Sequence, residues 1–228
     1  MNICVIPARG GSKRILRKNI KRFLGKPIIA YSIEAALGSN CFDQIIVSTD
    51  DDEIAKLATK YGAQVPFIRP PELSDDFSST LSVIKHAIGE QDSDHNIENV
   101  CCLYATAPFI DSNTLNESYE QFKNSDANYC LGITSFPFPI QRALRVSGDN
   151  CLTMFNQENS HKRSQDLDEA YHDAGQFCWG RATAFKDELS IYSGSTLPYI
   201  LQRDLVQDID TMEDWLRAEA MYKVLRSN

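Results

Sequence analysis

The chain has 228 residues, of which 43% are hydrophobic and 24% charged, and its formal net charge is −8. This is the composition of a globular protein, and the length suits one domain with or without an appended element. The net acidity argues against nucleic acid as the main partner, and no apolar stretch approaches the ~18 residues of a membrane span, so we expect no membrane association.

Positive charge is concentrated at the N-terminus. Eight Lys and Arg residues precede Glu34, the first acidic residue, while the rest of the chain carries 15 basic and 31 acidic residues. Because like charges repel one another, we expect such a block to face an anion.

The first half of the chain alternates strand and helix patterns. We expect strands over residues 2–8, 44–49, 63–68 and 100–105, and helices over 26–37, 53–60, 78–88 and 114–122. In the first helix, Pro27 lies near the start and Gly38 just past the end. Asp51 and Asp52 are expected to start the second helix, where negative charge favours the helix dipole. This alternation predicts a Rossmann-like α/β fold, a mostly parallel sheet with helices on both faces.

The pattern changes in the second half. A strand over 128–136 is followed by Pro137 and Pro139, and residues 140–165 form a predicted hairpin around 147–150 with a polar loop. Strands over 175–180 and 206–209 and a helix over 212–225 complete the chain. We therefore expect one domain spanning residues 1–228, with a protruding lid or dimerisation element at about 136–165.

The seven cysteines form no CxxC pair and no Cys/His zinc spacing. Several lie in apolar strand-like runs, where cysteine acts as a small hydrophobe. We expect all seven to be reduced, which indicates a cytoplasmic protein. The N-terminus also lacks the pattern of a signal peptide.

A loop rich in glycine and basic residues follows the first predicted strand, where open α/β sheets bind ligands. Its glycines let backbone N–H groups approach an anion, and its cations suit phosphates. The loop matches neither GxxxxGK[ST] nor GxGxxG, which disfavours a P-loop NTPase and a standard dinucleotide site. A solvated basic loop is the alternative. The candidate residues are Ala8, Arg9, Gly10, Gly11, Ser12, Lys13, Lys18 and Asn19.

Asp208 and Asp210 are two residues apart at the end of a predicted strand, so their side chains point the same way if the strand is extended. Two carboxylates facing a phosphate loop need a cation between them, and Mg²⁺ suits few carboxylates. Alternatively, Asp210 or Thr211 caps the following helix.

The stretch from Ile6 to Pro27, with its Pro-Ala-Arg-Gly-Gly-Ser-Lys-Arg and Leu-Gly-Lys-Pro segments, resembles the opening of sugar nucleotidyltransferases. It is most similar to the cytidylyltransferases that activate nine- and eight-carbon 2-keto sugar acids, the CMP-N-acetylneuraminate synthetase family. The resemblance implies that the loop holds the triphosphate of CTP. It further implies that Arg9 and Lys18 stabilise charge during transfer, that Asn19, Arg69 and Ser79 lie near the nucleoside, and that Asp208 and Asp210 bind the metal.

Two segments bear on the sugar. Sialic acid enzymes commonly carry a Gln and an Arg at and after the end of the strand predicted over 100–105, where this chain has Tyr104 and Ile110. They also carry an Arg-Pro pair where this chain has His172 and Asp173. The Tyr-His-Asp-Ala-Gly-Gln-Phe run at 171–177 and Ser-Phe-Pro-Phe-Pro-Ile-Gln-Arg at 135–142 resemble pseudaminic acid cytidylyltransferases. The expected sugar-binding residues are Tyr104, Thr106, Arg163, Gln165, Tyr171, His172, Gln176 and Phe177.

Arg163 is the expected partner of the sugar carboxylate, because a guanidinium fork suits a carboxylate. The resemblance implies a homodimer in which Gln141 or Arg142 contacts the partner chain's sugar. The predicted reaction transfers CMP from CTP to the anomeric hydroxyl of a nonulosonic acid, most simply pseudaminic acid, and releases pyrophosphate. Legionaminate, sialate and KDO are alternative substrates, and a catalytically idle nucleotide-binding module is the alternative from another class.

Overall fold

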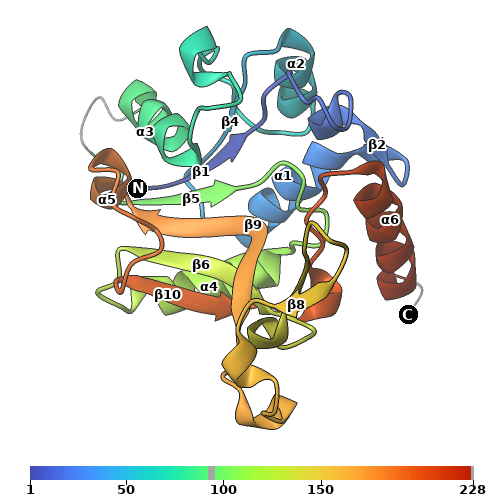
Figure 1. Ribbon diagram of the computed structural model, residues 1–228. Coiled ribbons are helices and arrows are strands. Elements are labelled where there is room, and N and C mark those ends of the chain that lie inside the picture. The colour runs from blue at the N-terminus through green and yellow to red at the C-terminus, as the bar shows by residue number, and fades with distance from the viewer. Residues whose placement is uncertain (92–95, 227–228) are drawn as a thin grey trace.

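A six-stranded sheet forms the centre of the computed structural model, which describes residues 1–91 and 96–226 (Figure 1). The strands lie in the order β10 (Thr196–Ile200), β6 (Tyr129–Ser135), β9 (Tyr171–Arg181), β5 (Asn99–Leu103), β1 (Asn2–Pro7) and β4 (Gln44–Ser48). Only β9 runs antiparallel to its neighbours; the other pairings are parallel. The expected mostly parallel sheet is confirmed.

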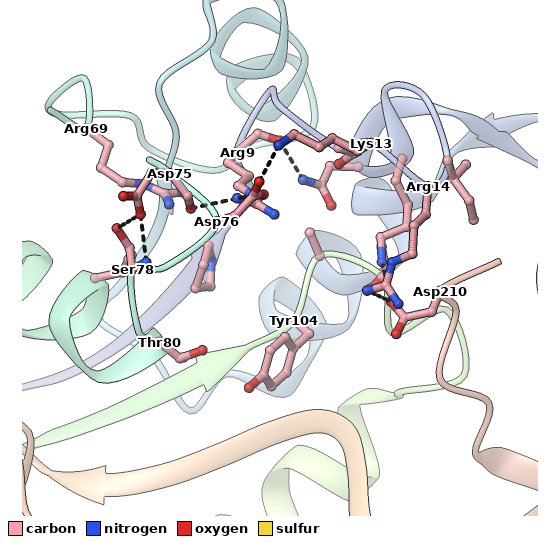
Figure 2. Close-up of a pocket in the computed structure, with 18 of the residues that line it drawn as sticks. Arg9, Lys13, Arg14, Arg69, Asp75, Asp76, Ser78, Thr80, Tyr104 and Asp210 are labelled. Atoms are coloured by element: carbon pink, nitrogen blue, oxygen red, sulfur yellow. Dashed lines mark hydrogen bonds and ion pairs between the residues drawn. The ribbon is translucent and has the colours of Figure 1, made fainter. Parts of the chain in front are cut away.

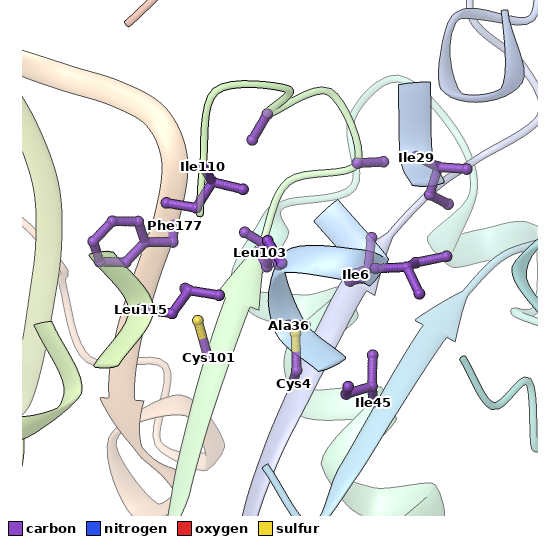
Figure 3. Packing of buried hydrophobic residues seen from close by; sticks show 14 of the residues in the cluster. Cys4, Ile6, Ile29, Ala36, Ile45, Cys101, Leu103, Ile110, Leu115 and Phe177 are labelled. Atoms are coloured by element: carbon purple, nitrogen blue, oxygen red, sulfur yellow. The ribbon is translucent and has the colours of Figure 1, made fainter. Parts of the chain in front are cut away.

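Helices cover both faces of this sheet because its strands are apolar on both sides. Along β1, Cys4 and Ile6 pack toward α1 (Ile28–Ser39), α2 (Asp52–Lys60) and α4 (Ser112–Lys123), as Figure 3 shows for part of this cluster. Ile3 and Val5 pack toward α3 (Thr80–Gln91) and α5 (Ala182–Lys186). None of the described helices is long and apolar enough to cross a membrane.

Five of the seven cysteines belong to these two clusters, and all seven are free thiols, as expected. Burial raises the pKa of Cys130 to about 12 and also raises the pKa of Cys102. These thiols are protonated at neutral pH and act as small core side chains.

A third cluster anchors the C-terminal helix α6 (Met212–Arg226) against the N-terminal region. Phe23, in the short pairing of β2 (Arg22–Phe23) with β3 (Lys26–Pro27), meets Tyr31 and Trp215 edge to face at 5.5 and 5.6 Å. This packing brings the segment that precedes α6 beside the loop that follows β1.

Two predicted strands and one helix end are wrong. Residues 63–68 make only a single bridge, from Gln64 to Ile46, because Pro66 has no N–H to continue a ladder. Residues 206–209 are extended but unpaired; Ile209 is apolar because it packs in the cluster under α6. Gly38 lies inside α1, which ends instead at Asn40 in the left-handed conformation, φ 54°.

β10 was not expected from the sequence. It carries Pro198, which an edge strand tolerates, and β10 is at one edge of the sheet.

The predicted excursion between β6 and β9 projects from the end of the sheet (Figure 1). It contains the expected hairpin, β7 (Leu144–Val146) paired with β8 (Leu152–Met154). Asn150 supplies the left-handed turn residue, with φ 62°. Short 3-10 turns follow at Gln157–Asn159 and Ser164–Asp166.

Asp51 caps α2, as expected for the helix start, and provides a test of the packing of the basic loop. Its carboxylate accepts the N–H groups of Glu53 and Ile54 at 3.0 Å and lies 2.9 Å from Nη2 of Arg17. The hydrogen bond from Arg17 is the main cause that lowers the pKa of Asp51.

A lowered carboxyl pKa stabilises the fold above the unfolded value of ~3.9, and the contribution is lost as the pH falls through the folded value. Asp51→Asn keeps a capping side chain but removes the charge. We expect it to lower the free energy of unfolding by ~1 kcal/mol at neutral pH, with the difference shrinking below about pH 4. Urea unfolding across this pH range measures the effect, and a difference independent of pH would contradict it.

Candidate active site

A cleft of about 290 Å³ lies at the carboxyl ends of β1 and β5, where the sequence placed the ligand. Basic side chains of the loop after β1 form one wall, and Thr80 and Tyr104 lie across from Lys13 (Figure 2). Of the predicted nucleotide and catalytic residues, those that line the cleft are Arg9, Ser12, Lys13, Lys18, Asn19, Arg69 and Asp210.

Asp76 neutralises two cations of this wall. Its carboxylate lies 2.8 Å from Nη1 of Arg9 and forms an ion pair with Lys13. Arg9 also donates to the backbone carbonyl of Asp75 at 2.6 Å. The hydrogen bonds from Lys13 and then Arg9 hold the pKa of Asp76 below its usual range. An acidic group thus occupies the position in which these donors would meet an anionic ligand.

Asp210 plays the same part for two further cations. Its Oδ1 lies 2.9 Å from Nη2 of Arg14 and 3.3 Å from Nζ of Lys18. Lys18 also donates to the carbonyl of Ile209 at 2.7 Å, which ties the loop after β1 to the segment before α6.

Asp210 does not cap α6. Asp214 accepts the N–H of Thr211 at 2.9 Å, and Thr211 Oγ1 accepts the N–H of Asp214 at 3.2 Å, so these two residues form a reciprocal cap. The carboxylate of Asp210 therefore lines the cleft and is not used to cap the helix.

Asp208 lies beside the β9 backbone at Gly175, a residue with φ +63° whose absent Cβ would be 3.6 Å from Oδ1 of Asp208. Although the residue as a whole is exposed, partial burial of its carboxyl and the nearby Asp210 raise its pKa, and Lys18 opposes this. Two neighbouring carboxylates next to a phosphate-type loop are a donor set that fits one divalent cation with ligand phosphates. No cluster of three or more potential metal ligands occurs among the described residues.

The glycines of the loop differ in role. A Cβ on Gly10 would lie 2.7 Å from Oδ2 of Asp51, so only glycine fits there. Its N–H donates to Asp50 at 2.8 Å and is not free for an anion, contrary to the expectation. Gly11 is exposed and meets no neighbour. Ala8 is buried, with its N–H bonded to the carbonyl of Ser48.

Of the three predicted nucleoside residues, Asn19 and Arg69 line the cleft and Ser79 does not. Asn19 donates to the carbonyl of Arg9 at 2.9 Å, which fixes the loop. Arg69 is 4% exposed and donates to two backbone carbonyls, while its Nε has no partner in the structure. Burial lowers the pKa of Arg69, but a guanidinium stays charged. Ser79 lies outside the cleft and lines a second cavity of about 260 Å³ behind Tyr104.

The predicted sugar residues fall into three groups. Tyr104 and Thr106 line the cleft, and Tyr104 also lines the second cavity. Gln176 and Phe177 are buried at 3% and 0% exposure and line neither, which contradicts a direct contact with the sugar. Because residues alternate along β9, Phe177 points into the core, and Gln176 donates to the carbonyl of Leu205 and supports the segment that leads to Asp208.

The third group belongs to the protruding element or its base. Arg163 pairs with Asp166 at 2.9 Å and, like Gln165, lies outside both cavities. Tyr171 donates to Glu169, and the ring of His172 lies 4.7 Å from that of Phe136. Gln141 donates to the carbonyl of Asp168 at 2.7 Å, and Arg142 ends the same 3-10 turn, Ile140–Arg142. Within one chain, the described structure does not bring these residues into the cleft.

Sequence reasoning missed the acids that face the basic loop. These are Asp75 and Asp76, which lie just before the Ser-Ser-Thr run at the start of α3. The only signal in the sequence was the position of two acidic residues next to a predicted helix start. Arg14, which is not among the predicted site residues, also pairs with Asp210.

Comparison with known proteins decides the family. The cytidylyltransferase family model matches residues 3–224. The chain is 49% identical over 224 residues, 98% of its length and 97% of the relative, to a pseudaminic acid cytidylyltransferase of Campylobacter jejuni (strain 81-176). This chain belongs to the cytidylyltransferase family. Members of the family generally use a divalent metal.

More distant relatives of this cytidylyltransferase act on related sugars. It is 32% identical over 97% of its length, and 96% of the relative, to the CMP-N,N'-diacetyllegionaminic acid synthase of Legionella pneumophila. Among solved structures, the CMP:2-keto-3-deoxy-manno-octonic acid synthetase complexed with CTP superposes with a TM-score of 0.71 at 14% identity, covering 97% of this chain and 98% of that one. That likeness establishes the fold.

Proposed function

We propose that the protein transfers CMP from CTP to the anomeric hydroxyl of pseudaminic acid and releases pyrophosphate. The observation that carries this assignment is 49% identity to a pseudaminic acid cytidylyltransferase over nearly the whole chain. The identity to the legionaminic acid enzyme, 32%, is lower over a similar span.

In this proposal the triphosphate of CTP takes the place of Asp76. Arg9 and Lys13 exchange one carboxylate for phosphate oxygens, which suit the same donors. These ion pairs are partly exposed and worth little, so the exchange costs little. Arg9 and Lys18 then face the charge that develops as the anomeric oxygen attacks the α-phosphate in line.

We assign Mg²⁺ to Asp208 and Asp210. When bound, the cation supplies charge neutralisation at the phosphates. In the structure, Asp210 forms ion pairs with Lys18 and Arg14. If Asp210 binds the metal instead, both side chains become available to the phosphates of the nucleotide. The fit rests on the two adjacent carboxylates and on the absence of any competing cap at Asp210.

In this proposal the sugar lies between the cleft and the second cavity. Tyr104 separates the two spaces and lines both. Apolar walls in the second cavity, from Leu131, Phe185 and Ile191, suit the methyl and acyl groups of such a sugar.

We further propose a homodimer formed through the protruding element. Large apolar side chains are exposed along it, at 37–79% of their surface: Phe136, Phe138, Ile140, Leu144, Val146, Leu152 and Phe155. A contiguous segment of this kind is typical of an interface. Arg163, Gln141 and Arg142 lie on the same element, outside their own chain's cleft, so a second copy of the chain would receive them.

Steady-state assays test the substrate. We expect CTP-dependent pyrophosphate release with pseudaminic acid, at a kcat/KM at least about tenfold above those with legionaminic acid, sialic acid and KDO. A higher kcat/KM with another of these acids would identify that acid as the substrate instead. CTP binding by calorimetry without turnover of any acid would instead identify an idle nucleotide-binding module.

Asp210→Ala tests the metal assignment. We expect the variant to lose at least about 10³-fold in kcat, because the cation would lose a ligand. CTP binding measured without metal should persist, because Lys18 and Arg14 are freed. Glu213→Ala, which removes an exposed carboxylate of α6, is the matched control and should keep wild-type activity. Undiminished Mg²⁺-dependent turnover of Asp210→Ala would refute the assignment.

Leu152→Glu tests the dimer. Leu152 is 68% exposed, so the substitution removes little packing within one chain. We expect light scattering to report a dimer for the wild type and a monomer with reduced activity for the variant. Leu216→Glu, at a similarly exposed position on α6 (61%), should remain dimeric. A fully active wild-type monomer would exclude the proposal.

A further inference from the structure

The second cavity combines apolar walls with one carboxylate. Leu131, Cys178, Phe185 and Ile191 line it, and Asp173 and Tyr192 contribute the polar groups beside them. Thr80 and Tyr104 border both this cavity and the cleft, so the two spaces adjoin at these side chains. Such a mixed lining suits a ligand group that is largely apolar but carries a hydrogen-bond donor.

Asp173 has unused acceptor capacity. Its Oδ1 accepts the N–H of Gly175 at 2.8 Å, and its Oδ2 accepts the hydroxyl of Tyr192 at 3.3 Å. An ionised carboxylate offers about four acceptor positions. Among the described residues no cation pairs with it, unlike Asp76 and Asp210 in the cleft. The carboxylate is held in place but leaves room for another donor.

The negative charge of Asp173 affects the pKa values of two tyrosines beside the cavity. Burial and then Asp173 raise the pKa of Tyr192. Asp173 also contributes to the raised pKa of Tyr104, after the neighbouring Cys102 and burial. Tyr104 and Tyr192 therefore stay protonated, and their neutral hydroxyls add hydrogen-bonding groups to an otherwise apolar cavity.

We propose that Asp173 is a specificity-determining residue of this enzyme, which accepts the N–H of an acylamino group of the sugar in the second cavity. This inference rests on the proposed function, since it assumes an acidic sugar as substrate. The acyl methyl group packs against Leu131 and Phe185, and the amide N–H meets the free lone pairs of Asp173.

The same charge orients the sugar. The sugar's own carboxylate is repelled by Asp173 and attracted to the cations of the cleft, so the acidic and acylamino ends of the substrate are directed to different cavities. Discrimination by repulsion of the wrong end is a common route to specificity. A group lacking the N–H leaves the lone pairs of Asp173 without a donor in the occupied cavity and binds less well.

The test compares pseudaminic acid with two analogues in which hydrogen replaces one or the other acylamino group. We expect Asp173→Ala to raise the KM for pseudaminic acid roughly 10- to 100-fold, the loss of one hydrogen bond to a charged group. The wild-type preference for pseudaminic acid over one analogue should fall by the same factor. The KM for CTP should stay within about twofold, because the nucleotide half of the site is untouched.

Asp173→Asn keeps an acceptor oxygen and should recover part of the preference for pseudaminic acid over that analogue. A merely structural role would change the KM for both sugars alike and leave this preference unchanged. Asp173→Asn also serves if the alanine variant fails to fold. Asp187→Ala, at an exposed acid in the loop that leads to Tyr192, is the matched control and should match the wild type.

The outcomes separate the two proposals. An unchanged preference over both analogues in an active Asp173→Ala enzyme would overturn the role of Asp173 and leave the proposed function intact. A wild-type enzyme that turns over no acidic sugar would overturn the proposed function, and this inference with it.

Discussion

The neutralisation of the N-terminal basic block is the constraint on which the site depends. Eight cations in 33 residues cannot pack together unless their charge is balanced, and acids from distant segments balance it. Asp76 meets Arg9 and Lys13, Asp210 meets Arg14 and Lys18, and Asp51 meets Arg17. These contacts join the loop after β1 to the starts of α2 and α3 and to the segment before α6. The charge pattern alone predicted that the block faces an anion; in the structure, carboxylates of the chain itself take that position.

Neutralisation by exposed carboxylates also keeps the loop ready for ligand exchange. The side chain of Lys13 is 79% exposed and that of Asp76 39% exposed, so water screens their attraction and the pair is easily opened. A buried pair would be costly to break. Phosphate oxygens offer the same cations several acceptors at once, which gives a nucleotide the advantage over a single carboxylate.

Much of the architecture could be predicted because it follows from local pattern. The buried strands β1, β4 and β5 are continuous apolar runs, and Asp51 is a typical N-cap residue before α2. Tertiary contacts decided the rest. Ile209 was taken for a strand residue because an apolar side chain under α6 looks the same in sequence as one in a sheet. Gln176 and Phe177 were assigned to the sugar because the pattern does not tell which side of β9 meets the cleft. The pairing of Asp76 with the basic loop could not be found from spacing, since 63 residues separate it from Lys13.

Different elements form the two halves of the site, and this separation bears on specificity. The loop after β1 and the start of α3 surround the cleft, whereas β9 and the loop after α5 contribute Asp173 and Tyr192 to the second cavity. Tyr104 and Thr80 are the shared boundary. Under the proposed function, a substitution on β9 would therefore change which sugar fits without moving the cations that face the nucleotide. A change at Tyr104 affects both halves, because its ring is a wall of each cavity. The replacement of Gln by Tyr at this position, noted from the sequence, thus falls on the boundary between the proposed nucleotide and sugar sites.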